Sequence, residues 1–174
     1  MRTLARAARP TNMSVMANDG KEPASPACSA HEMGDAYMGF LPRDELVAFL
    51  NTLLEAERAG ARICQRTARE ARDAGDENLA ALMTAVRDDE AHWCAVLTQA
   101  IRALEGAPSS ATGAFYEKAA AIADLPARVK FINRGQSWVV RELRKTLPRI
   151  RDDALHARMK AMLAGHEANI VKAS

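Results

Sequence analysis

The chain has 174 residues, of which 48% are hydrophobic and only 5% are aromatic, and its formal net charge is +2 at pH 7. This length suits one domain, and the abundance of Ala, Leu, Arg and Glu is typical of helices that share an apolar core. No stretch approaches the roughly 20 consecutive apolar residues that a membrane span requires, so we expect no transmembrane segment.

Residues 1–40 are rich in Ala, Pro, Ser, Asn and Met and show no sustained hydrophobic period, which predicts a disordered N-terminal extension before a domain over residues 41–174. Three arginines and no acidic residue precede Asp19. That opening is typical of an organelle-targeting presequence, but a start site assigned upstream of Met13 or Met16 would also explain it. The opening lacks the apolar middle of a secretion signal.

Two long helices are expected first. Pro42 suits the first turn of a helix that runs to about residue 74, and Gly75 ends it. Asp76 can cap the next helix, which continues to about residue 105 before Gly106 and Pro108. The apolar residues in both segments recur at intervals of three and four, as on the buried face of a helix.

Two further helices follow a connecting segment that holds a short helical piece, residues 114–123. Asp124 and Pro126 begin the third helix, which ends near Pro148, and Asp152 or Asp153 caps the fourth. The sequence thus predicts an all-α four-helix bundle of two antiparallel hairpins, joined by a crossover of about 20 residues that carries the short helix.

The three cysteines, Cys28, Cys64 and Cys94, cannot form a complete set of disulfides, and two of them lie inside expected helices. This favours a reducing compartment, and we expect a cytoplasmic protein. A homo-oligomer is compatible with the exposed helix faces, because faces that form dimers resemble other exposed faces in a single sequence.

Two glutamates interrupt the apolar stripes of the first two helices. Glu57 continues the stripe of Leu50 and Leu53, and Glu90 follows Val86 at the same helical spacing. An ionised carboxylate that faces a dry core is unfavourable by several kcal/mol unless it is paired, hydrogen-bonded or bound to a metal. We therefore predict a metal ion between the two. Pairing with arginines such as Arg58, Arg62 or Arg87, or a shared proton, is the alternative.

Two helix pairs with an inward glutamate on each of the first two helices resemble the ferritin and rubrerythrin superfamily and, more narrowly, uncharacterised bacterial ferritin-like domains. The resemblance covers residues 41–174. In that superfamily a di-iron site takes one Glu from each of two helices and a Glu-x-x-His pair from each of the other two.

The resemblance implies a set of metal ligands, although each Glu-x-x-His pair keeps only one half. Glu57 matches the single Glu of the first helix. Glu90 matches the Glu of the first pair, with Trp93 where the His would stand. His166 matches the His of the second pair, with Leu163 where the Glu would stand.

The third helix should supply a single glutamate, and Glu142 is the only acid between Pro126 and Arg151. By elimination it is the fourth candidate ligand. On a plain hairpin, however, Glu142 and His166 differ by roughly 15 Å in level, at 1.5 Å per residue. His156 would lie level with Glu142 but at the edge of the apolar stripe, so either histidine is a candidate ligand.

Carboxylate and imidazole donors suit iron, manganese or zinc, held as one ion or as a loosely bound pair. The sequence therefore predicts a protein that binds iron or another divalent metal. An oxidoreductase that uses oxygen or peroxide is compatible with iron that has open coordination positions, and whether the protein is an enzyme stays open.

An alternative function comes from the basic face of the third helix. Lys130, Arg134, Arg141 and Lys145 project to nearly one side, and this strip suits an interaction or anion-binding module without metal. Acids elsewhere, among them Asp88, Asp89, Glu105, Asp152 and Asp153, are available to balance the strip. Aromatic residues do not alternate with its basic residues, so we do not expect nucleic-acid binding.

Overall fold

A computed structural model describes residues 38–174. This part of the chain contains five α-helices, one 3-10 helix and no strand, which confirms the all-α prediction. The elements are α2 (Arg43–Asp73), α3 (Glu77–Ala103), α4 (Phe115–Ala120), α5 (Leu125–Thr146), η2 (Leu147–Arg149) and α6 (Asp153–Lys172). None of the helices in residues 38–174 combines the length and apolar character needed to cross a membrane.

The expectations for the start of the chain, a disordered extension and a targeting sequence or upstream start site, fall almost entirely on residues outside those described. The first described helix begins beside Pro42, which is its N-cap residue. The prediction that a separate folded domain starts near residue 41 therefore stays a prediction.

Local capping sets the helix boundaries. Asp76, Asp124 and Asp152 each accept a hydrogen bond from the backbone N–H three residues later, at 2.9, 2.8 and 2.6 Å. Such bonds satisfy N–H groups that have no partner inside the helix, and they fix the start of α3, α5 and α6. Gly75, with φ of 79°, supplies the left-handed conformation that ends α2 and turns the chain into α3.

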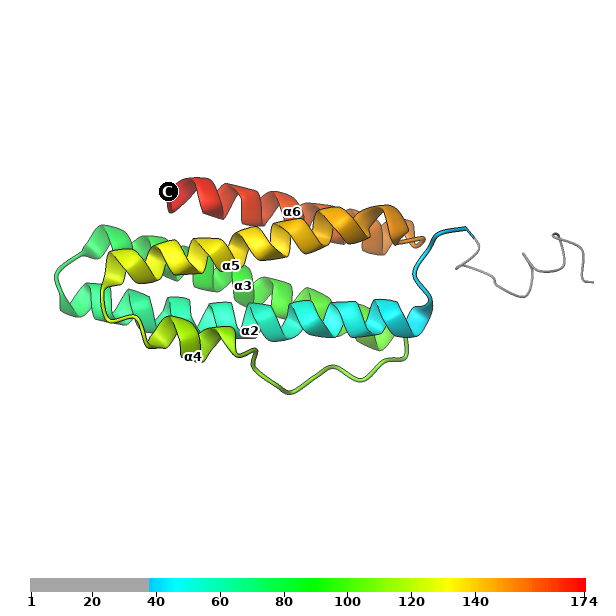
Figure 1. Ribbon diagram of the computed structural model, residues 1–174, viewed down its shortest axis with the longest axis horizontal. Helices are drawn as coiled ribbons and strands as arrows, with labels where there is room; N and C mark the ends of the chain where they lie inside the picture. The colour runs from blue at the N-terminus through cyan, green and yellow to red at the C-terminus, as the bar shows by residue number, and fades with distance from the viewer. Residues whose placement is uncertain (1–37) are drawn as a thin grey trace, which may run out of the picture. The chain divides into compact units, whose positions relative to one another are not determined.

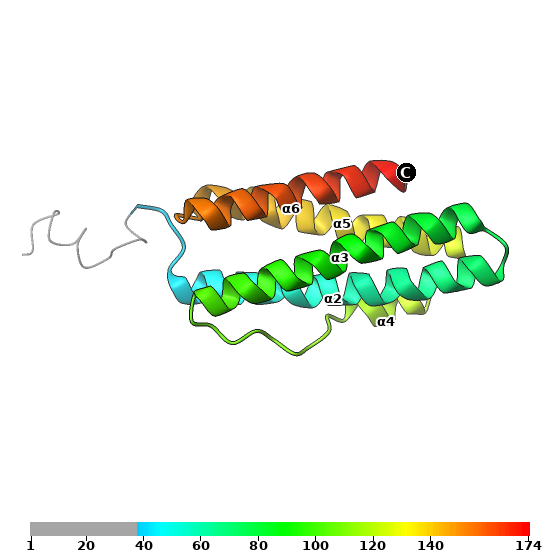
Figure 2. The same ribbon diagram turned by 180° about the vertical axis from the view of Figure 1, so that it is seen from behind.

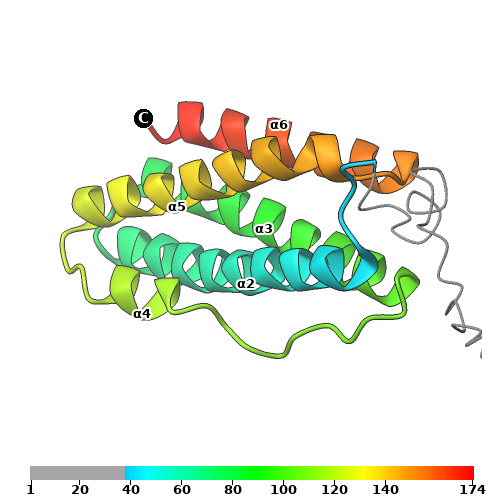
Figure 3. The same ribbon diagram turned by 45° about the vertical axis from the view of Figure 1, so that its right-hand side comes forward.

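The long helices lie side by side in two antiparallel pairs. Figure 1 shows α2 beside α3 and α5 beside α6, and Figure 2 shows the same pairs from behind. After α3 the chain returns along α2 to α4, which lies against α2, before α5 begins at the other end of the helices (Figure 3). Further contacts join α2 to α5 and α3 to α6, so each pair covers the apolar stripes of the other.

The core consists of two apolar clusters with polar residues between them. One cluster includes Leu50, Leu97 and Leu143, and the other includes Met83 and Ile132. Within residues 38–174 the buried polar or charged side chains are Glu57, Thr67, Glu90, Arg128, Gln136, Thr146, His166 and Asn169. Several of these fall between the two clusters along α2, α3 and α5, where they interrupt an otherwise continuous core.

Candidate metal centre

Four helices each place one polar side chain at this interruption of the core. Glu57 comes from α2, Glu90 from α3, Gln136 from α5 and His166 from α6. One ligand atom from each of Glu57, Glu90 and His166 lies within 4.8 Å of the others, and these side chains are 0%, 4% and 1% exposed. The structure therefore brings together three of the four residues that the sequence selected as metal ligands.

The turn at Gly75 brings the two carboxylates to the same level. Glu57 precedes this turn by 18 residues and Glu90 follows it by 15, so the antiparallel helices set them opposite each other. Gly60, one turn after Glu57, makes room for the second carboxylate, because a Cβ there would lie 2.6 Å from the Glu90 Cδ atom. A side chain at position 60 would therefore displace Glu90.

His166 is oriented by its own helix. Its Nδ1 atom lies 3.0 Å from the Met162 carbonyl oxygen, which can only accept, so Nδ1 donates in this bond and Nε2 is the ring nitrogen that faces the other side chains. Nε2 faces Glu57 Oε1 at 3.2 Å. An ionised carboxylate and this nitrogen are both acceptors, so the contact calls for a proton or a cation between the two atoms.

The two carboxyl groups resist ionisation in this environment. Burial raises the pKa of Glu57 to about 8, although a hydrogen bond with Glu90 acts in the opposite direction. Burial raises the pKa of Glu90 well above its usual range, and the charge of Glu57 raises it further. Without a cation, the pair is therefore stable only when it retains protons at neutral pH.

Hydrogen bonding leaves this group incompletely satisfied. Gln136 donates from Nε2 to Glu90 Oε1, which orients that carboxylate. Glu57 Oε2 and Gln136 Oε1 are buried and have no hydrogen-bond partner. Buried polar atoms are usually paired, so these two unpaired acceptors leave the cluster able to take a hydrogen-bond donor or a cation.

Arginine pairing, the alternative weighed from the sequence, is not what the structure shows at these glutamates. Arg58 donates to the carbonyl oxygens of Ser109 and Ala111. Arg62 lies over the Tyr116 ring, and Arg87 pairs with its neighbour Asp88. Among residues 38–174, the ion pairs of the arginines do not include Glu57 or Glu90.

The donor set fits a divalent cation. Metal–oxygen and metal–nitrogen bonds of about 2.0–2.2 Å place the donors of one ion roughly 3–4.4 Å apart, so three donor atoms that lie within 4.8 Å of one another are close to the separations that binding requires. Neither Cys64 nor Cys94 belongs to this group of ligand atoms, and burial raises the pKa of both thiols, that of Cys94 to about 12. The donors are thus oxygen and nitrogen atoms, which suit iron, manganese or zinc.

Glu142 lies outside this cluster. It is partly exposed near the end of α5, and Gln136, six residues earlier, is the residue that α5 contributes. The reason is the difference in level along the hairpin, because the residue of α5 that lies level with His166 must be further from the α5–α6 turn than Glu142 is. His156 is also partly exposed and outside the cluster, so His166 is the histidine of the centre.

Sequence reasoning missed Gln136 and Gly60, although both carry a signal. Gln136 lies in the apolar stripe of Ile132, Val139 and Leu143, which is the pattern that identified Glu57. A search restricted to acids passes over it. Gly60 lies on the same stripe as Glu57, in the middle of a long helix where glycine is unfavourable by roughly 0.5–1 kcal/mol relative to alanine.

Comparison with protein families gives a match. The model of a domain of unknown function (DUF6306) matches residues 44–174. The chain belongs to this family. No curated protein and no solved structure matches the chain. All four residues of the centre lie inside the DUF6306 domain, as do all the helices that carry them except the first residue of α2.

Proposed function

We propose that this DUF6306 domain is a ferritin-like four-helix bundle that binds iron, or another divalent metal such as manganese or zinc. Its ligands are Glu57, Glu90 and His166. One observation carries the proposal: three buried ligand atoms lie within 4.8 Å of one another, on three different helices. The antiparallel pairs α2–α3 and α5–α6, with residues 104–124 running between them as the crossover, support the ferritin-like arrangement.

Each residue has a defined role in this centre. Glu57 and Glu90 supply anionic oxygen donors, and two carboxylates neutralise one divalent cation, which removes the unfavourable burial of net charge. His166 supplies a neutral nitrogen donor that the Met162 carbonyl holds in position. Gln136 orients Glu90 from outside the ligand set.

An oxidoreductase reaction is the first class to test. A redox-active ion with open coordination positions supplies oxygen or peroxide chemistry when it is bound. Glu57, Glu90 and Gln136 line one end of a cavity, so a small molecule has access to the centre.

Metal content tests this proposal. The chain is purified without chelators or a histidine tag, and its metal per chain is measured beside that of a Glu57→Gln, Glu90→Gln double variant. We expect close to one or two ions per wild-type chain and a loss of at least tenfold in the variant, because an amide is a far weaker ligand than a carboxylate.

A second double variant serves as the control. Glu117→Gln with Glu142→Gln removes the same charge from exposed and partly exposed positions outside the cluster, and it should retain the wild-type metal content. Equal metal in all three proteins, or equal loss in both variants, refutes the site.

One observation favours the alternative function, an anion-binding surface on α5. Lys130, Arg134, Arg141 and Lys145 are exposed. Three acids that were available to balance them are engaged elsewhere: Glu105 with Arg43, Asp88 with Arg87 and Asp89 with Asn169.

Inorganic polyphosphate is a suitable probe for that surface. The double variant Arg141→Gln, Lys145→Gln should bind it more weakly than a Lys160→Gln, Lys172→Gln control, which removes two exposed charges from α6. Equal weakening by both variants would show that polyphosphate binding depends on the overall charge of the domain and not on this surface of α5.

A further inference from the structure

A cavity of about 280 Å³ adjoins the metal centre. Glu57, Glu90 and Gln136 line one end of it, and most of the remaining wall is apolar, including Ile132 and Trp138. Protein interiors leave few voids larger than a water molecule, so core packing alone does not explain a space of this size. A concave apolar pocket with a few convergent polar groups is the usual form of a small-molecule site.

The cavity reaches the surface of the domain. Thr52 on α2 and Ala114 before α4 both line it, and both are exposed. A ligand can therefore enter between α2 and the start of α4 and reach the carboxylates, without separation of the long helices.

The connecting segment that forms one wall is fixed to α2. Ser109 donates from its backbone N–H to Asn51 Oδ1 at 2.6 Å and from its hydroxyl to Glu55 Oε1 at 2.5 Å. The Gly113 N–H donates to the Glu55 carbonyl oxygen at 3.1 Å. These bonds hold the wall in place in the absence of any ligand.

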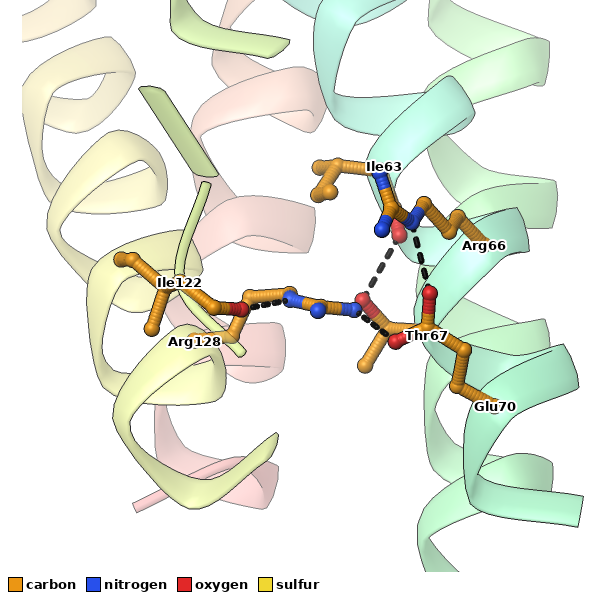
Figure 4. Close-up of polar contacts among 6 residues, drawn as sticks. All are labelled: Ile63, Arg66, Thr67, Glu70, Ile122 and Arg128. Atoms are coloured by element: carbon orange, nitrogen blue, oxygen red, sulfur yellow. Dashed lines mark hydrogen bonds and ion pairs between the residues drawn. The ribbon is translucent and has the colours of Figure 1, made fainter. Parts of the chain in front are cut away.

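The turn after α4 is fixed to α5, and through Arg128 to α2. Figure 4 shows Arg128 of α5 between the Ile122 carbonyl oxygen, at 2.8 Å, and the Glu70 carboxylate of α2, at 2.6 Å. Phe115, which lines the cavity, stacks on Phe131 of α5 with ring centroids 4.9 Å apart. With both ends of this wall anchored, the cavity is preformed, which lowers the ordering cost of binding.

The polar end of the cavity requires a hydrogen-bond donor from its ligand. Gln136 uses Nε2 to hold Glu90, and its buried Oε1 has no partner. This oxygen stays unpaired even when Glu57 and Glu90 bind a metal, so a ligand hydroxyl is the group that satisfies it. The ligand should also be neutral, because two carboxylates repel an anion and a divalent cation already balances them.

The volume limits the size of the ligand. An apolar cavity of about 150 Å³ holds a benzene-sized molecule, and drug-sized ligands fill roughly 300–1,000 Å³. At about 280 Å³ this cavity lies between the two.

We propose that the cavity binds a small, neutral, largely apolar molecule of about ten non-hydrogen atoms, whose single hydroxyl group donates to Gln136 Oε1. That this ligand is the substrate of the metal centre rests on the proposed function. Binding itself rests only on the cavity and the unpaired oxygen.

Three related probes test the ligand class: 4-propylphenol, propylbenzene and 4-propylbenzoate. Calorimetry is performed on metal-free protein and on zinc-loaded protein, because zinc binds the same donors but has no redox chemistry. We expect 4-propylphenol to bind about threefold to tenfold more tightly than propylbenzene, the worth of one net hydrogen bond, and 4-propylbenzoate to bind more weakly than either. Equal affinity for all three, or no binding of 4-propylphenol, overturns the proposal.

Variants locate the binding. Ala114→Leu at the opening and Ala56→Leu on the α2 wall should each weaken 4-propylphenol binding at least tenfold. Ala111→Leu, exposed in the same segment but outside the lining, should leave it unchanged. Gln136→Met should remove the preference for 4-propylphenol over propylbenzene while propylbenzene still binds. A preference that survives in Gln136→Met overturns the assigned hydrogen bond.

The two proposals fail separately. If the wild-type protein holds metal at Glu57 and Glu90 but does not bind 4-propylphenol, the proposed metal centre stands and the proposed cavity ligand is refuted. If the protein binds 4-propylphenol but holds no metal, the proposed cavity ligand stands and the proposed metal centre is refuted.

Discussion

The domain buries charged side chains in two places, and the two differ in how the charge is satisfied. In the Arg128 cluster (Arg66, Glu70 and Arg128), one carboxylate lies between two guanidinium groups at 2.6 Å, and a hydrogen bond from Arg66 lowers the pKa of Glu70 (Figure 4). In the candidate metal centre two carboxyl groups face each other and their pKa values are raised. Charges balanced by their neighbours stabilise the fold, whereas the facing carboxyl groups have no such partner, which is why we propose that a cation binds between them.

Breaking the Arg128 cluster should have the largest effect on stability. Glu70→Leu leaves a guanidinium that is 1% exposed without its counter-ion, and we expect a loss of about 3–5 kcal/mol in the free energy of unfolding. Arg128→Leu should be less severe, about 1–3 kcal/mol, because Glu70 keeps Arg66 and water while the Ile122 carbonyl loses its partner. Urea unfolding measures both.

Arg66→Gln provides the scale for this comparison. The Arg66 side chain is 37% exposed, and an exposed ion pair contributes under about 1 kcal/mol. Similar losses of stability in Glu70→Leu and Arg66→Gln would show that the buried ion pair of Arg128 stabilises the fold no more than an exposed one does.

Metal binding should stabilise the domain by the next largest amount. A ligand that binds only the folded state, at 100 times its dissociation constant, contributes about 2.7 kcal/mol. For a domain of this size that corresponds to a rise of about 8 °C in Tm with added Mn(II) or Fe(II). The Glu57→Gln, Glu90→Gln variant should show no rise, and an equal shift in both proteins would place the metal elsewhere.

The stability of the metal-free protein should depend on pH in the direction opposite to that of an ordinary salt bridge. Glu57 has a folded pKa of about 8 against a usual 4.5, so between these values the folded state binds more protons than the unfolded state. The free energy of unfolding therefore falls as pH rises through this window.

The double variant isolates this effect from other titrating groups. Glu57→Gln, Glu90→Gln removes both carboxyl groups, so the difference in stability between the wild type and the variant should change across the same window. Because metal binding displaces the protons, the stabilisation that metal gives should grow as pH rises. A difference that stays constant from pH 5 to pH 8.5 would contradict the raised pKa values.

Gly60→Ala tests the fit of the two carboxylates with the smallest change. The added Cβ would overlap the Glu90 carboxylate, so we expect at least a tenfold loss of metal affinity. Gly165→Ala is the matched control in α6, because its Cβ would meet Trp93 at 3.6 Å, an ordinary contact. It should stabilise the domain by about 0.5–1 kcal/mol without weakening metal binding. Equal affinities in the two variants would show that room at position 60 is irrelevant.

Local signals made the helices predictable. Asp76, Asp124 and Asp152 accept the capping hydrogen bonds expected of them, and Gly75 adopts the conformation that ends α2. Each depends on a few neighbouring residues, so one sequence suffices. Glu57 and Glu90 were also accessible, because their distances from one turn set them at the same level on adjacent helices.

What the sequence did not yield depends on contacts between distant segments. In the sequence Arg128 cannot be told apart from the exposed basic residues of α5. Only its contacts with Glu70 and the Ile122 carbonyl oxygen make it a buried residue. The choice of Glu142 combined the resemblance with its being the only acid in that helix, whereas the residue of α5 at the level of the cluster is Gln136, which donates to Glu90. Whether the inward glutamates pair with arginines likewise depends on distances between side chains of different helices, which the spacing of residues along the chain does not give.

The most direct measurement is an anomalous difference map from crystals of the metal-loaded protein. Our account predicts a peak between the Glu57 carboxylate, the Glu90 carboxylate and His166 Nε2, within about 2.2 Å of each bound donor atom. A map without a peak there, from crystals soaked in metal at a saturating concentration, would contradict it.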